Sequence, residues 1–137
     1  MDYTVSLLTT AADCQAAINI ARAEKENLDY KRMGLSRQRQ SATLNAASIE
    51  AELAAVNAEL EVLQQILNTV QEGQLKEETR GKFKKADYKK FLLENKKANY
   101  GALSMIEKEY DLASNDKVIA ETVDYINALE NRMKELS

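Results

Sequence analysis

The sequence predicts an all-α fold, a long antiparallel two-helix coiled-coil hairpin, on three observations. Apolar residues recur at every seventh position along both halves of the chain, and no proline interrupts either half. A short segment containing Gly73 separates the two halves. A sevenfold apolar repeat keeps one side of a helix facing a partner, as in coiled coils. Two such runs joined by one turn predict a single helical-hairpin domain over residues 1–137.

The first helix is predicted over residues 11–71, after an N-terminal extension of residues 1–10. Thr9 and Thr10 are both suitable N-caps, because a threonine hydroxyl can accept a hydrogen bond from a free amide of the first turn. One apolar line runs through Cys14, Ala21, Leu28, Leu35, Ala42, Ile49, Val56, Leu63 and Val70. The companion line, four residues further on, runs through Ile18, Lys25, Arg32, Arg39, Ala46, Leu53, Leu60 and Leu67.

The second helix is predicted over residues 79–136, after a turn at residues 72–78. Gly73 suits a left-handed cap that closes the first helix, and Thr79 is a candidate N-cap for the second. Its apolar line runs through Phe91, Ala98, Met105, Leu112, Ile119, Ile126 and Met133. Each predicted helix would be roughly 85–90 Å long at the α-helical rise per residue.

The second helix also has a companion line, four residues further on, which runs through Asn95, Ala102, Glu109, Asp116, Val123 and Glu130. Charged residues in the middle of the two companion lines support an antiparallel pairing. A turn near residue 75 would place Arg39 beside Glu109 and Arg32 beside Asp116, and it would bring Lys25 near the acidic residues Glu121 and Asp124. Cations on a seam cost stability unless they are partnered. We therefore predict that Lys25, Arg32, Arg39, Glu109 and Asp116 set the register of the two helices.

An alternative fold is a four-helix bundle. Gly34 could interrupt the first helix and the Ser114-Asn115-Asp116 segment could interrupt the second, and the antiparallel pairing places these two points opposite each other. A joint break there would fold the chain into four shorter helices. Because both sevenfold lines pass through these points without a change of phase, continuous helices are the favoured prediction.

The composition argues against an enzyme and against a bound metal or cofactor. The chain has no histidine and one cysteine, and its four glycines are scattered singly rather than gathered in a phosphate-binding loop. Cys14 is predicted to be a small buried hydrophobic residue. The single cysteine, the lack of a signal-peptide pattern and the lack of a long apolar run predict a cytoplasmic protein without a membrane span.

The leading functional prediction is a non-catalytic structural or interaction module: a scaffold, spacer or assembly subunit that forms homodimers. Five apolar residues beside the seam lines allow two interpretations, a broadened seam or a second face for another copy. These residues are Tyr30, Met33, Tyr100, Leu103 and Tyr110.

The second functional prediction concerns the lysine-rich stretch of residues 80–97. Its lysines could bind a nucleic acid or another anionic surface, with Lys84, Lys85, Lys89 and Lys90 as the candidate residues. The favoured interpretation is that these lysines face glutamates of the first helix, such as Glu59.

Overall fold

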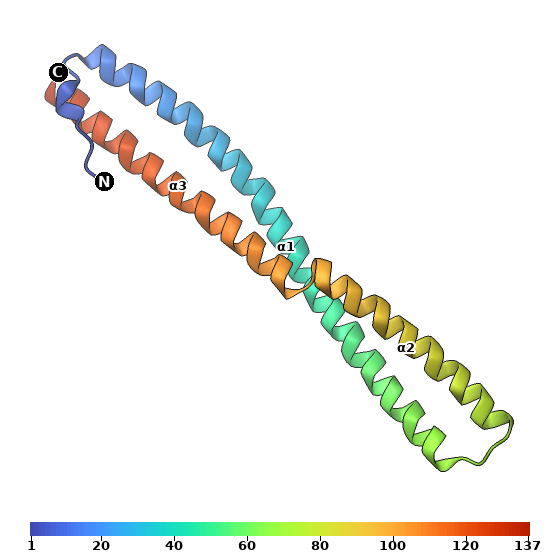
Figure 1. Ribbon diagram of the computed structural model, residues 1–137. Helices are drawn as coiled ribbons and strands as arrows, with labels where there is room; N and C mark the ends of the chain where they lie inside the picture. Colours follow the sequence, from blue (N-terminus) through green and yellow to red (C-terminus); the bar gives the residue numbers. More distant parts are fainter. The chain divides into compact units, whose positions relative to one another are not determined.

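The structure, a computed structural model, describes all 137 residues and is all-α. A short 3-10 helix, η1 (Val5–Leu7), precedes α1 (Ala11–Thr69), α2 (Gln74–Tyr100) and α3 (Ala102–Glu135), and there is no β-strand (Figure 1). None of these helices combines the length and apolarity needed to cross a membrane. The contacts divide the chain into unit 1, Met1–Gln38 with Glu109–Ser137, and unit 2, Arg39–Lys108.

Unit 1 pairs the first part of α1 with α3, and the two helices run in opposite directions (Figure 1). Its buried apolar side chains are Cys14, Ile18 and Ala21 from α1, and Ile126 and Leu129 from α3. The Cys14 side chain is fully buried, which confirms its prediction as a core residue. The backbone amide of Asp13 donates to Thr10 Oγ1 at 3.1 Å, so Thr10 caps the helix that begins at Ala11, as predicted.

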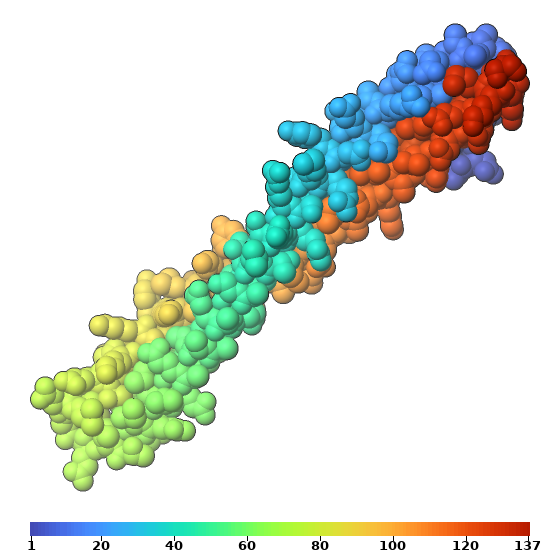
Figure 2. Space-filling model, turned by 180° about the vertical axis from the view of Figure 1, so that it is seen from behind, coloured from blue at the N-terminus to red at the C-terminus, as the bar shows by residue number.

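The N-terminal segment folds back onto the C-terminal part of α3, as the space-filling view also shows (Figure 2). The ring of Tyr3 lies 4.9 Å from the ring of Tyr125, and its hydroxyl donates a hydrogen bond to Glu121. The Arg132 guanidinium donates to the carbonyls of Leu8 at 3.0 Å and Ser6 at 3.3 Å. The predicted extension is therefore an ordered part of unit 1.

The Tyr3 hydroxyl makes the docking of this segment sensitive to alkaline pH. The hydrogen bond to Glu121 is the main cause that raises the pKa of Tyr3 from 10.0 to about 12. A pKa that is higher in the folded state stabilises that state at pH values below the pKa of the unfolded chain. This stabilisation is lost as the pH rises from 10.0 through about 12. We therefore expect the N-terminal segment to lose its hydrogen bond to Glu121 over this interval.

The measurement is phenolate absorbance during an alkaline titration, taken as wild type minus Tyr3→Phe. The difference curve should titrate above the ordinary tyrosine range. A difference curve centred on the ordinary value would show that Tyr3 does not donate to Glu121.

Unit 2 pairs the second part of α1 with α2 (Figure 1). Leu60 and Phe83 pack against its main core, which consists of Ile49, Leu53, Val56 and Leu63 from α1 with Ala86 and Leu93 from α2. Every buried residue of α1, in both units, lies on one of the two predicted lines. The buried residues of α1 thus agree with the predicted lines, although Arg32 and Arg39 on the second line are exposed.

The predicted apolar line is wrong for α2. Phe91 is 55% exposed and Ala98 is exposed, whereas the buried residues of α2 are Thr79, Ala86 and Leu93, also seven apart. Thr79 is not a cap, because its hydroxyl donates to the Leu75 carbonyl at 2.7 Å inside the helix. The outward position of Phe91 follows from burying Leu93, since residues two apart on a helix point in different directions.

The boundaries around the turn also differ from the prediction. Helix α1 ends at Thr69, and α2 begins at Gln74, five residues before the predicted start. Gly73 precedes α2 as its N-cap, with φ +156°, rather than closing α1. A positive φ of this kind is readily adopted by glycine, so Gly73 lets the chain turn directly into the second helix.

A single continuous second helix is also wrong, because Gly101 separates α2 from α3. Its ψ of −151° leaves the helical region, although its amide still donates to the Lys97 carbonyl at 2.9 Å. The predicted line is buried or half-buried in α3, for example at Met105 and Ile126, but not in α2. The seven-residue line of buried positions in α2 is therefore a different line from the one in α3, and the change occurs at Gly101. Neither Gly34 nor Asn115 interrupts its own helix.

Candidate interaction surfaces

Of the predicted register charges, Arg32 and Asp116 form a direct pair across unit 1. Arg32 Nε donates to Asp116 Oδ1 at 2.6 Å, and Nη2 lies 3.4 Å from Oδ2. The hydrogen bond from this guanidinium to Asp116 is the main cause that raises the pKa of Arg32. Both side chains remain more than 40% exposed, so the pair lies at the edge of the helix interface.

The other register charges are placed differently. Lys25 does not reach the predicted acids of the second half, since its ammonium lies 2.8 Å from Asp29 one turn further along α1. Pairs four residues apart on one helix are close neighbours, which gives Lys25 a local partner. Arg39 is exposed on α1 in unit 2, and Glu109 is half-buried on α3 in unit 1. Their mutual pairing stays a prediction.

Asn115 is a buried polar residue whose role the sequence analysis missed. Its side chain is 5% exposed, and its Nδ2 donates to the Leu28 carbonyl of α1 at 3.2 Å. A buried asparagine in a helix interface favours the one register in which it finds a partner. Asn115 lies seven residues before Thr122 and fourteen before Leu129, and residues seven apart share a side of a helix. This spacing is the signal in the sequence that Asn115 lies on the same side of α3 as the buried Leu129.

The Arg32–Asp116 pair can be tested by exchanging its charges. Arg32→Glu and Asp116→Arg should each destabilise the fold, because each places like charges together. The double variant should recover part of that loss, because the attraction is restored with the signs exchanged. The measurement is a denaturant double-mutant cycle at low salt, and a coupling within error of zero would contradict the contact.

The four candidate lysines of α2 do not form one group. Lys84, Lys85 and Lys89 are exposed and make no ion pair within the chain. Lys90 is half-buried, and its ammonium lies 4.0 Å from Glu94 on the same helix. The predicted pairing with Glu59 is therefore not formed, and the lysine of this stretch that does reach α1 is Lys97, 2.7 Å from Glu50.

An aromatic and aliphatic cluster lies among the exposed lysines. The rings of Tyr88 and Phe91 stack with centroids 6.4 Å apart, and both side chains are more than half exposed. Leu92 is 48% exposed. Residues three, four and seven apart share a side of a helix. The α2 outer face is defined by Lys84, Lys85, Tyr88, Lys89, Phe91 and Leu92.

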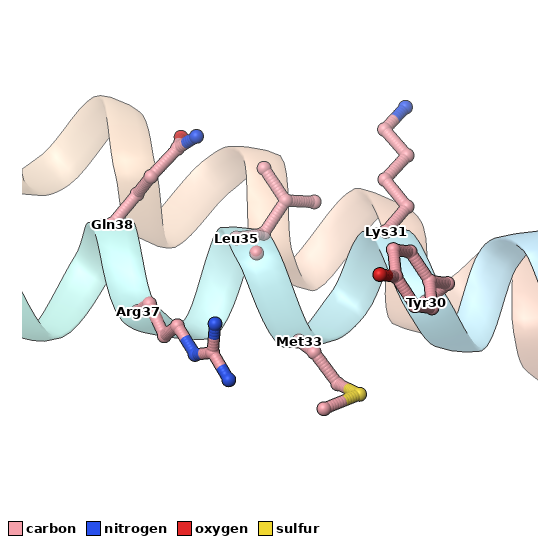
Figure 3. A pocket seen from close by; sticks show the side chains of 7 residues that line it. Tyr30, Lys31, Met33, Leu35, Arg37 and Gln38 are labelled. Atoms are coloured by element: carbon pink, nitrogen blue, oxygen red, sulfur yellow. The ribbon is translucent and has the colours of Figure 1, made fainter.

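A second feature is a surface depression of about 440 Å³ on α1 in unit 1. Its lining residues all belong to this one helix, and they are Tyr30, Lys31, Met33, Gly34, Leu35, Arg37 and Gln38. Figure 3 shows Met33 and Arg37 projecting to one side of α1, and Lys31, Leu35 and Gln38 to the other. Tyr30 is 80% exposed and Met33 is 55% exposed. Tyr30 and Met33 therefore do not broaden the seam within this chain.

Comparison with known proteins adds no relative: no family model, curated protein or solved structure matches the chain.

Proposed function

We propose that this protein is a non-catalytic helical interaction module, built as an antiparallel coiled-coil hairpin, that associates with a second copy of itself. The observation that carries the proposal is the depression at Gly34 on the exposed side of α1. It supports binding of another helix rather than chemistry, because its lining offers neither histidine nor a carboxylate.

Exposed apolar side chains support a need for partners. Its exposed large hydrophobic side chains include all five of the residues that lay beside the predicted seam lines, Tyr30, Met33, Tyr100, Leu103 and Tyr110. Neighbouring exposed apolar side chains can mark an interaction site, and Tyr30 and Met33 are such neighbours on α1.

The Gly34 depression has the residue spacing of a coiled-coil hole. A hole that accepts a side chain from a facing helix is formed by four residues at positions i, i+3, i+4 and i+7. Tyr30, Met33, Gly34 and Arg37 have this spacing, and all four line the depression. A Cβ added at Gly34 would meet nothing within 4 Å, so the hole is open in the isolated chain. In a two-fold dimer each copy would offer the same hole and the same Tyr30 and Met33 side chains.

Gly34→Gln tests this proposal. Glutamine would fill the hole and would also favour the helix over glycine, so the variant should stay folded but lose self-association. Gly81→Gln is the matched control, because Gly81 lies inside α2 and is equally open. Sedimentation equilibrium up to high micromolar concentration should show dimers for wild type and control, and monomers for Gly34→Gln. A monomeric wild type, or a dimeric Gly34→Gln, would contradict the proposal.

A further inference from the structure

We propose that the α2 outer face binds the surface of an anionic lipid bilayer, as a peripheral contact. This site is separate from the Gly34 hole, which lies on α1 in unit 1. Membrane binding and self-association can therefore be tested, and can fail, independently.

The positive charge of the chain is concentrated on α2. This helix carries nine basic and four acidic residues, a net charge of +5, whereas the whole chain carries −3. Lys84, Lys85 and Lys89 are exposed and have no carboxylate partner in the chain. Unpaired lysines at a negatively charged bilayer surface each contribute a favourable electrostatic attraction, so this face has the charge that such a surface attracts.

The apolar residues of the face provide the second requirement of an interfacial helix. Tyr88, Phe91 and Leu92 are exposed together on the side of α2 that does not pack against α1. Lys84 lies one turn before Tyr88, and Lys89 lies three residues before Leu92. Exposed apolar side chains beside lysines can enter the boundary between the headgroups and the acyl chains where a basic helix contacts a bilayer. Long lysine side chains can at the same time reach the phosphates.

The chemistry of the face favours lipid over nucleic acid. Tyr88 and Phe91 stack on each other, with an interplanar angle of 24°, whereas single-stranded nucleic acids are bound by rings that stack on successive bases. The cations of the face are all lysines, and the one arginine of α2, Arg80, is held by Glu72 at 2.8 Å and Glu77 at 3.0 Å. Leu92 has no stacking role with a base, but it contributes to insertion into a bilayer.

The chain contains no tryptophan, so Phe91→Trp introduces a single fluorescent reporter on the face. Vesicles of phosphatidylcholine with roughly a third phosphatidylserine are compared with vesicles of phosphatidylcholine alone. Tryptophan emission should shift to shorter wavelength with the anionic vesicles only. Ile20→Trp, at an exposed position of α1 outside the Gly34 depression, is the matched control and should show no shift. An unchanged emission of Phe91→Trp with anionic vesicles would overturn the proposal.

Vesicle flotation measures the contribution of the lysines. The triple variant Lys84→Gln, Lys85→Gln and Lys89→Gln should bind anionic vesicles about a hundredfold more weakly than wild type. The control variant Lys108→Gln, Lys117→Gln and Lys134→Gln removes the same charge outside α2 and outside the Gly34 depression, and should bind nearly as wild type. Equal losses in both variants would show that binding depends on the net charge of the chain and not on the α2 outer face, and this would overturn the proposal. Tighter binding to a labelled single-stranded oligonucleotide than to vesicles would assign the face to nucleic acid and overturn the lipid proposal.

Discussion

Leu93→Ala should lower the free energy of unfolding by about 2–5 kcal/mol, the range for removing a buried leucine side chain. Leu93 is 6% exposed and belongs to the core of unit 2 with Leu53 and Val56. Phe91→Ala, two residues away on the same helix, should change this free energy by no more than about 0.5 kcal/mol. The reason is that Phe91 is 55% exposed and lies outside this core.

This pair of variants distinguishes the observed register of α2 from the one that the sevenfold line predicts. Both are measured by denaturant unfolding under identical conditions, with helical circular dichroism as the signal. If Phe91→Ala were the more damaging of the two, the line through Phe91 and Ala98 would be the true seam, and the packing of α2 would have to be revised.

Gly101→Ala should destabilise the protein by about 1–3 kcal/mol, the range for forcing extra atoms into a packed site. A Cβ at Gly101 would lie 2.5 Å from the Lys97 carbonyl oxygen and 2.9 Å from Lys97 Cγ. The oxygen belongs to the backbone and accepts the Gly101 amide, so it cannot move aside without loss of that hydrogen bond. The clash arises because Gly101 leaves the helical conformation while its amide keeps the helical bond.

Gly81→Ala is the control, since a Cβ at Gly81 meets nothing within 4 Å inside the same helix. It should stabilise the protein by up to about 1 kcal/mol, because alanine favours the helix over glycine. Opposite signs for the two substitutions in thermal unfolding are the expected result. A stabilising Gly101→Ala would mean that α2 and α3 can join into one helix without cost.

The all-α class and α1 up to its last turn could be predicted from the sequence. The two sevenfold lines between Cys14 and Val70 keep a constant offset of four residues along the helix. Only the side of the helix that carries both lines could therefore be buried. The start of the helix was equally determined, because the hydroxyl of Thr10 is a local cap that needs no distant partner. The Arg32–Asp116 contact followed from opposite charges at positions that only an antiparallel pairing brings together.

The buried side of α2 depends on its contacts with α1. Apolar residues such as Phe91 and Leu93 lie on two different sides of this helix, and the sequence cannot say which side α1 covers. The periodicity of apolar residues also could not predict the break at Gly101, the docking of Tyr3 or the hydrogen bond from Asn115 to Leu28. Each depends on contacts between atoms distant in sequence or on one backbone angle, whereas a heptad pattern records only the average direction of side chains along a helix.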